Sequence, residues 1–373
     1  MARKVYFISA RCTKYSYQES LCGKFDNLLK SFDFSQYYKK NQIIPIKMHF
    51  GNPGANQTIR PGFIRQIVEA VKRIKARPFV TDSSRLNAYA YIELANQNGY
   101  NFLSLGAPLI IADGIYGNDS IEVDAGELLK KVSIASSIYD AKGMIVATHV
   151  KGHIQAGLGG SLKNIAMGGV TFTPRNSTWE KGRGRAHFLM DPNIYWDMSA
   201  CNFCGICKQN CPTDAIHIKD KKWSFDNNKC WRCGRCIRIC PQKALSTKQN
   251  DELFQRALAE QAKAVLQTFP PKKVVYINFL LDMQPECDCM PSCDTPVVPN
   301  LGIMMSDDPV AIDTASLDCI QKSRTLPNSQ ADEVIVPDGS DIFSALHNKD
   351  ARGHIRYAEE YGLGTTHYEL VEF

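Results

Sequence analysis

The stretch QIIPIKMHFGNPGANQTIRPGFIRQIVEAVKRIKARPFVTD, residues 42–82, decides the fold class of this 373-residue chain. It begins and ends with short apolar and β-branched runs, residues 42–50 and 78–82, which are typical of buried strands. Between them, residues 61–75 repeat Ile, Val and Ala at helical spacing and start with a proline, which suits the first turn of a helix. This order predicts an α/β fold in which the strands are largely parallel.

The same alternation continues on both sides of this stretch. Further strand-like runs are KVYFISA (4–10), PLIIAD (108–113), GMIVATHV (143–150) and VVYINFLLD (274–282), and LFQRALAEQAKAVLQ (253–267) has helical spacing. We therefore expect a Rossmann-like α/β domain with a mostly parallel sheet.

Two cysteine motifs interrupt the alternation. CNFCGICKQNCP (201–212) and CWRCGRCIRICP (230–241) both read Cys-x2-Cys-x2-Cys-x3-Cys-Pro. This is the spacing of bacterial two-cluster ferredoxins, in which the fourth cysteine of each motif binds the other cluster. The prediction is two [4Fe–4S] clusters, one held by Cys201, Cys204, Cys207 and Cys240, the other by Cys230, Cys233, Cys236 and Cys211. Zinc also uses Cys-x2-Cys ligands, but two complete quartets that each end in Cys-Pro favour iron and sulfide.

The motifs define an inserted module. We predict an α+β ferredoxin-like module over residues 195–248, and one discontinuous α/β domain made of residues 1–194 and 249–373. The insert carries ten Lys and Arg against four Asp, which accounts for the whole formal charge of +6. Such a face suits an acidic redox partner of the ferredoxin or flavodoxin type, or it is simply solvated. Nucleic acid is not expected, since the basic residues belong to the cysteine motifs.

Composition indicates the compartment. No run of about 18 apolar residues is present, and MARKVYFISARC at the start does not resemble a signal peptide, so we expect a cytoplasmic protein without a membrane segment. Thiols stay reduced in that compartment, and 14 cysteines there favour metal binding over disulfides.

Lysine and histidine residues cluster where two predicted strands end. Residues 42–50 deliver Lys47 and His49, and residues 143–150 deliver His149, followed by Lys151 and His153. The glycine-rich stretch AGLGGSLKNIAMGG then adds Lys163. Ligands of α/β sheets bind beyond the carboxyl ends of strands, so these side chains could hold a small anionic substrate and supply protons. Ordinary turns and structural histidines are the alternative.

Three more cysteines follow the strand at 274–282, in the stretch CDCMPSC. Cys287, Cys289 and Cys293 could bind a third iron–sulfur cluster, could form a redox-active dithiol or a zinc site, or could be structural. Cys12, Cys22 and Cys319 stand in apolar, mixed contexts, and we expect them to be packing residues.

Two other segments carry several polar residues. In SDDPVAIDTAS, we expect Asp307 or Asp308 to cap a helix that starts at Pro309. The alternative is that these two residues and Asp313 bind substrate or a cation. The loop before the insert could bridge the pocket and the clusters, or it could be a solvated lid. Its basic residues are Arg175, Lys181, Arg183, Arg185 and His187.

These motifs together resemble one family. KMHFGNPG (47–54), THVKGHIQAGLGGSLKNIAMGG (148–169), the paired cysteine motifs and ECDCMPSCDTPVVPNLGIMMSDDPVAIDTAS (286–316) follow in the order of the domain-of-unknown-function 362 family. Members with a ferredoxin insert are called iron–sulfur centre proteins. The resemblance implies a redox protein of microbial, mostly anaerobic, cytoplasm, with no settled substrate. In that family the Cys-x-Cys pair recurs, whereas the third cysteine varies in position.

The sequence therefore supports two main alternative functions. The first is a ferredoxin-fed reductase, in which electrons pass the two clusters and reach the Cys287/Cys289/Cys293 site beside the Lys/His residues. The second is a dedicated electron carrier, which recognises a protein partner and transforms no small molecule. An iron–sulfur sensor or assembly scaffold is a third alternative.

Overall fold

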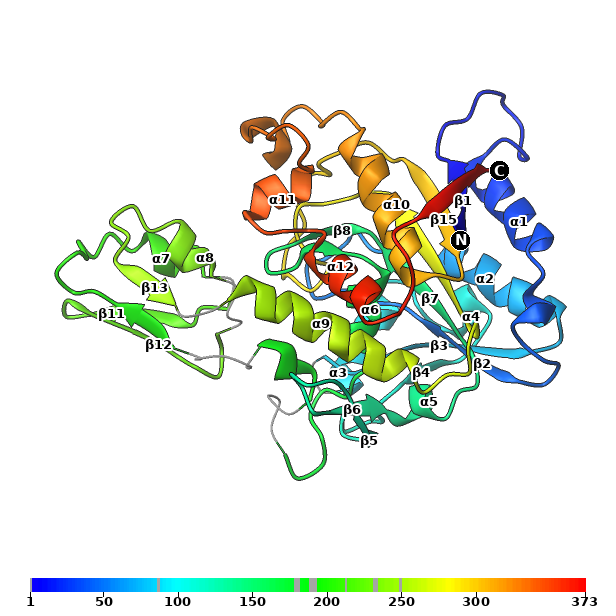
Figure 1. The fold of residues 1–373 in the computed structure, drawn as a ribbon, viewed down its shortest axis with the longest axis horizontal. Coiled ribbons are helices and arrows are strands. Elements are labelled where there is room, and N and C mark those ends of the chain that lie inside the picture. Colours follow the sequence, from blue (N-terminus) through cyan, green and yellow to red (C-terminus); the bar gives the residue numbers. More distant parts are fainter. Residues whose placement is uncertain are drawn as a thin grey trace.

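An eight-stranded sheet forms the centre of the structure (Figure 1). The computed structural model describes residues 2–85, 88–177, 182–187, 193–211, 213–230, 234–247 and 250–373. Neighbouring strands are parallel except at β15, which runs against both of its neighbours. From edge to edge the strands are β16 (Tyr368–Glu372), β1 (Arg3–Ser9), β15 (Gly302–Ser306), β14 (Val274–Leu280), β7 (Met144–His149), β2 (Ile43–Lys47), β3 (Arg77–Asp82) and β4 (Leu109–Ile111).

The six strand-like runs of the sequence are all strands of this sheet, so the expected mostly parallel α/β fold is confirmed. Every residue of β7 and β14 is buried. A central parallel strand is covered on both faces, which explains why its sequence is a continuous apolar run.

Helices cover both faces of the sheet. The α-helices are α1 (Leu21–Ser31), α2 (Pro61–Arg73), α3 (Ala88–Gln97), α4 (Phe102–Leu105), α5 (Ser136–Tyr139), α6 (Ser161–Gly168), α7 (Ile206–Gln209), α8 (Arg235–Arg238), α9 (Asp251–Leu266), α10 (Pro309–Gln321), α11 (Ile342–His347) and α12 (Gly353–Glu360). The expected helices are α2 and α9, and α2 begins at its proline as predicted. Asp308 caps α10 by accepting hydrogen bonds from Val310 N and Ala311 N, whereas Asp307 does not.

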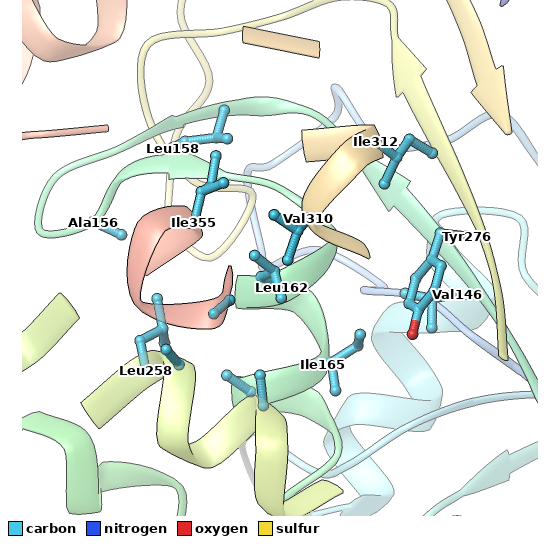
Figure 2. Close-up of a cluster of buried hydrophobic side chains, with 14 of the residues drawn as sticks. Val146, Ala156, Leu158, Leu162, Ile165, Leu258, Tyr276, Val310, Ile312 and Ile355 are labelled. Carbon is cyan, nitrogen blue, oxygen red and sulfur yellow. The ribbon is translucent and has the colours of Figure 1, made fainter. Parts of the chain in front are cut away.

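Alternate residues of the central strands belong to two separate hydrophobic cores. Ile145 and Ile277 face the core under α1 and α2, while Val146 and Tyr276 face the core under α6, α9, α10 and α12. In the second core, α6 lies between the sheet and three other helices. Figure 2 shows its residues Leu162 and Ile165 near Leu258 of α9, Ile355 of α12 and Val310 of α10.

Short antiparallel hairpins complete the α/β part. They are β5 (Ser120–Asp124) with β6 (Lys131–Ala135), and β8 (Lys151–His153) with β9 (Gly157–Gly159). The second hairpin follows β7 directly and leads into α6, so it places Lys151 and His153 next to the carboxyl edge of the sheet.

The cysteine-rich insert forms a small unit at one end of the structure, on the left in Figure 1. Its strands pair as β10 (Ile194–Trp196) with β13 (Leu245–Thr247) and β11 (Ile216–Lys219) with β12 (Lys222–Phe225). A small core of its own contains Ile216, Trp223, Cys236 and Leu245. The domain boundaries at 194/195 and 248/249 stay a prediction. Within the described part of the chain, no helix is both long and apolar enough to span a membrane.

Candidate active site

A pocket of about 600 Å³ opens at the carboxyl ends of four adjacent strands, β14, β7, β2 and β3. This volume lies within the usual range for small-molecule sites. Its lining contains a single carboxylate, that of Asp82, among the described residues. The cationic and histidine side chains in the lining are Lys47, His49, Arg85, Lys151, His153, Lys163, Arg183 and His187.

The site residues predicted from the strand ends mostly meet here. Lys47, His49, Lys151, His153 and Lys163 line the pocket, as do Arg183 and His187 from the loop before the insert. The remaining predicted residue, His149, lies behind the pocket wall. Arg175 is exposed, Arg185 is bonded to the carbonyl of Leu129, and Lys181 lies outside the described residues.

Asp82, at the end of β3, organises one wall. Its Oδ1 lies 3.2 Å from Lys47 Nζ, and its Oδ2 accepts hydrogen bonds from His49 Nδ1 (3.0 Å) and the Tyr91 hydroxyl (2.7 Å). Burial alone would raise the pKa of Asp82, but the Lys47 ammonium and His49 hold that pKa well below its usual range. Asp82 is therefore an anion that orients both side chains.

His49 is held with one ring nitrogen towards the pocket. Because Nδ1 donates to Asp82, the neutral ring carries its lone pair on Nε2. Nε2 is buried and has no hydrogen-bond partner in the structure, and the ring lines the pocket. Burial lowers the pKa of His49, so the ring is neutral near pH 7 and can exchange a proton with a bound molecule.

Lys47 is fully enclosed and has little room. Its ammonium group donates to Asn164 Oδ1 of α6 and pairs with Asp82. Burial, only partly offset by Asp82, lowers the pKa of Lys47 to about 8. A Cβ at Gly168 would lie 2.0 Å from Lys47 Nζ and 2.4 Å from Asp82 Oδ1, so this ion pair requires a glycine there.

A second buried carboxylate, Asp288, holds Lys151 of the pocket lining in place. It accepts a hydrogen bond from His149 Nδ1 at 2.8 Å and pairs with Lys151 Nζ at 2.8 Å. The other nitrogen of His149 faces the carbonyl of Leu281 at 2.8 Å. Both nitrogens of His149 are therefore engaged, so it positions Asp288 and Lys151 and is not free to act on a ligand.

Two cysteines of the CDCMPSC stretch meet beside Lys151. A turn closed by the hydrogen bond from Met290 N to Cys287 O (2.8 Å) brings Cys287 and Cys289 to the same side, where their thiols hydrogen bond. Lys163 Nζ lies 3.3 Å from Cys287 Sγ. We call Cys287 and Cys289 the thiol pair. Cys289 lines the pocket, while Cys287 is 2% exposed and lies behind it.

The charge of the thiol pair is unequal. The hydrogen bond from Cys289 lowers the pKa of Cys287, as do Lys163 and His153, and together they outweigh burial, so Cys287 is the thiolate. The pKa of Cys289 is raised because it donates to Cys287 and is itself buried. A thiolate beside a thiol is the arrangement that favours thiol chemistry.

His153 completes this group. Its ring and both thiols place their ligand atoms within 4.8 Å of one another, which is close enough for a shared metal ion. However, His153 Nδ1 accepts hydrogen bonds from the backbone N–H groups of Gln155 (3.2 Å) and Ala156 (3.0 Å). The neutral ring therefore carries hydrogen on Nε2, which donates to Cys287. In this tautomer His153 offers no lone pair to a metal ion.

Cys293 is not part of this group, contrary to the expected three-thiol site. Its Sγ instead accepts hydrogen bonds from the backbone N–H groups of Asn56 (3.1 Å) and Gln57 (3.4 Å). The chain turns away after Cys289 because Pro291 packs on the loop after β2. A Cβ at Gly54 of that loop would lie 2.2 Å from Pro291 O.

Asp313 has a structural role in the site. Its carboxylate accepts hydrogen bonds from Ser161 N (2.8 Å) and Leu162 N (2.9 Å) at the start of α6, and from the Asn278 side chain (2.9 Å). It thereby fixes the helix that carries Lys163 and Asn164. The alternative of ligand binding by Asp313 is not needed to explain these contacts.

The expectation that Cys12 and Cys22 are packing residues was wrong, because both are exposed. Cys12 lies in the loop after β1, and Cys22 is on the outer side of α1, whose buried residues begin at Gly23. Cys319 is half-buried and packs against the core of α10.

In the insert, four cysteines surround one hollow. Its cysteines are Cys201, Cys204, Cys207 and Cys240, three from the first motif and one from the second. Gly205, directly after Cys204, has a positive φ of 79° and immediately precedes the first residue of α7. Of the other quartet, Cys211, Cys230 and Cys236 are described, while Cys233 lies outside the described residues.

The second cysteine motif lies against the thiol loop. Arg235, next to Cys236, pairs with Glu286, next to Cys287, at 3.8 Å. Asn228, two residues before Cys230, lines the same pocket as Cys289. Burial raises the pKa of Glu286 to about 7, although Arg235 opposes this shift.

Several functional residues could not be found from sequence. Asp288, Tyr91 and Asn164 carried no signal, because their roles come from partners far along the chain. Asp82 did carry one, since it ends a predicted strand of the parallel sheet. Arg85 also lines the pocket, just beyond the same strand.

Comparison with known proteins identifies a family. No curated protein sequence matches the chain. Among solved structures it is similar to the lactate racemase apoprotein from Thermoanaerobacterium thermosaccharolyticum, with 10% identity and a TM-score of 0.34 over 74% of this chain and 51% of that one. It is also similar to a structural-genomics protein from Thermotoga maritima, with 10% identity and a TM-score of 0.35 over 78% and 55%. The chain thus spans about half the length of each.

The family model described as "Domain of unknown function (DUF362)" matches residues 44–318. That range contains the residues that line the pocket, from Lys47 to Met290, together with both cysteine motifs and the thiol pair. Because the match covers well over half of the sequence, the chain belongs to the DUF362 family.

Proposed function

We propose that this chain is an iron–sulfur reductase that receives electrons in the inserted module and uses them at the thiol pair. One observation carries the proposal: the second cysteine motif lies directly against the loop that holds Cys287. The Arg235–Glu286 pair and the position of Asn228 in the pocket lining both support it. An electron carrier without substrate chemistry would not need a 600 Å³ pocket at this contact.

The cysteines of the insert fit [4Fe–4S] clusters. The hollow lined by Cys201, Cys204, Cys207 and Cys240 is the crossed combination that a two-cluster ferredoxin uses. Cys211, Cys230, Cys233 and Cys236 would hold the second cluster. When bound, such clusters supply one-electron transfer.

The pocket supports a small anionic substrate. Lys47, Lys151, Lys163 and Arg183 attract negative charge, and the enclosed walls strengthen that attraction. His49 presents Nε2 to the cavity and is oriented by Asp82, so it supplies or accepts a proton at the bound molecule. Cys289 of the thiol pair lines the same pocket.

The decisive experiment combines cluster counting with reoxidation. Anaerobically reconstituted wild-type protein should contain about eight irons per chain, and so should the Cys287→Ser/Cys289→Ser variant. The protein is then reduced with dithionite, freed of reductant and mixed with a panel of small anionic oxidants. We expect at least one of them to reoxidise wild type at least tenfold faster than it reoxidises the double variant.

The His49→Gln variant tests the pocket separately, since it should keep its iron but lose most of this acceleration. Equal reoxidation of all three proteins by every anion would overturn the reductase and leave the carrier. Fewer than about six irons in reconstituted protein would overturn the cluster assignment.

A further inference from the structure

The thiol pair has too few partners to hold a metal ion. Within the described ranges, the only group of three or more His, Cys, Asp or Glu residues whose ligand atoms are close enough to share an ion is that of His153, Cys287 and Cys289. His153 is in the tautomer that donates, and Cys293 is bound to the loop after β2. Two thiols remain, whereas structural zinc and iron–sulfur sites use four ligands.

The surroundings of the pair suit thiol–disulfide chemistry instead. Cys287 Sγ is surrounded by three donors, Lys163 Nζ, the His153 ring and the Cys289 thiol. These donors stabilise a thiolate, which is both the attacking and the leaving form of sulfur. The turn closed by Met290 N keeps the two sulfurs together, so little rearrangement is needed to join them.

We propose that Cys287 and Cys289 are a redox-active pair that reduces a small anionic disulfide, with Cys289 as the sulfur that meets the substrate. This rests on the proposed function for its electron supply. Cys289 is chosen because it lines the pocket, while Cys287 is buried behind it and resolves the mixed disulfide. The cationic lining selects an anion.

The Cys287 thiolate takes the proton of Cys289, and Cys289 then attacks one sulfur of the substrate, so the substrate S–S bond breaks and one half leaves as a thiol with that proton. Cys287, again a thiolate, attacks Cys289 Sγ, the pair closes to a disulfide, and the second half of the substrate leaves as a thiolate. Two electrons from the low-potential protein donor that feeds the insert, together with one proton, return the pair to thiolate and thiol.

The first test uses a dianionic aromatic disulfide, 5,5′-dithiobis(2-nitrobenzoate), as the probe. The background is the Cys12→Ser/Cys22→Ser/Cys293→Ser/Cys319→Ser chain, since these four cysteines are at least partly exposed and lie outside the thiol pair and the cysteine motifs. The reconstituted protein should release two thionitrobenzoate ions per chain, and the peptide with Cys287 and Cys289 should become lighter by two hydrogen atoms and resist alkylation. The Cys287→Ser variant should release one ion and keep a mixed disulfide on Cys289, and Cys289→Ser should lose the fast phase.

The second test separates charge from thiol reactivity. A neutral probe, 2,2′-dithiodipyridine, should react about tenfold more slowly than the dianion in wild type, and Lys47→Gln should remove most of that preference. A mixed disulfide that forms equally on both cysteines, or iron or zinc that depends on both, would overturn the proposal.

Failure of the pair and failure of the proposed function are distinguishable. If the pair closes with the probe but reduced protein does not reopen it, the thiol chemistry stands and the electron route from the insert falls. If the pair never closes although anions reoxidise the reduced protein through the pocket, the thiol chemistry falls and the reductase stands.

Discussion

At the scale of single residues, two buried carboxylates hold the lysine and histidine side chains at the pocket in place, and this role does not require that they contact a ligand themselves. Asp82 orients Lys47 and His49, and Asp288 orients Lys151 and His149. Such groups are costly to bury unless they are paired, so the positions around them tolerate little change.

Gly168→Ala should destabilise the protein by about 1–3 kcal/mol, because the new methyl group would overlap Lys47 Nζ and Asp82 Oδ1. The measurement is the free energy of unfolding in urea. Gly62→Ala in α2 is the matched control, since a Cβ there meets nothing within 4 Å, and it should be neutral or slightly stabilising. Equal effects at both glycines would show that Lys47 is not confined.

Glu286→Gln should change the pH dependence of stability. Burial raises the pKa of Glu286 to about 7, above the value of 4.5 for an unperturbed glutamate, so the folded state binds the extra proton. The stabilisation by that proton is fully present below about pH 4.5 and is lost as the pH rises through 7. The glutamine variant should therefore be more stable than wild type by about 1–3 kcal/mol at pH 8, with the difference shrinking at pH 6. Thermal unfolding of reconstituted protein measures this, and a constant difference at both pH values would contradict it.

At the scale of elements, the site is built by the carboxyl ends of parallel strands and by the start of α6. The strands could be predicted from sequence because β7 and β14 are buried on both faces and read as continuous apolar runs. Short β15 and half-exposed β16 gave no such signal. The sequence pattern did not indicate helix α6 either, although Lys163 on this helix is one of the predicted site residues.

Asp313→Ala should loosen α6. The substitution leaves Ser161 N, Leu162 N and the Asn278 amide without their acceptor, which costs about 2–3 kcal/mol for buried donors. Because Lys163 sits on the same helix, reaction of the thiol pair with an anionic disulfide should also slow. The control is Asp33→Ala, an exposed cap of a short 3₁₀ turn, which should cost no more than about 1 kcal/mol and leave the thiols unchanged.

The lysines and histidines of the pocket could be predicted from the sequence, whereas their contacts with carboxylates could not. Lys47, His49, Lys151 and His153 follow predicted strands, and strand ends of a parallel sheet converge. By contrast, His149 meets Asp288 across 139 positions of the chain, and only the fold determines such a contact. Cys293 is close to Cys287 and Cys289 in the sequence, but the packing of Pro291 on the loop at Gly54 separates it from them in the structure. The metal content of the insert stays a prediction.

At the scale of the whole molecule, charge is divided between two parts. The entire formal charge of +6 lies between residues 195 and 248, whereas the rest of the chain is balanced. The insert also forms one end of the structure, so its basic surface is available to a donor protein (Figure 1).

Reduction by an acidic donor should therefore slow as salt increases, because exposed charges are screened within about 8 Å at physiological ionic strength. Lys221→Glu/Lys222→Glu, on the exposed β11–β12 turn, should lower the second-order rate constant about tenfold at low salt. Lys39→Glu/Lys40→Glu makes the same charge change on the exposed α/β surface and should have little effect. Stopped-flow absorbance of the donor measures the rate, and equal losses in both variants would exclude docking on the insert.

The place of β1 in the sheet has a consequence for biosynthesis. Among the strands that the structure describes, β1 (Arg3–Ser9) pairs with β15 and β16, which begin at Gly302 and Tyr368. During translation β1 therefore emerges long before either partner, and this apolar strand cannot pair until Gly302–Ser306 has been made. Contacts this distant in sequence form slowly, and unpaired strands attract other chains. β1 therefore completes its pairing late, and a chaperone that shields it would raise the yield of native protein.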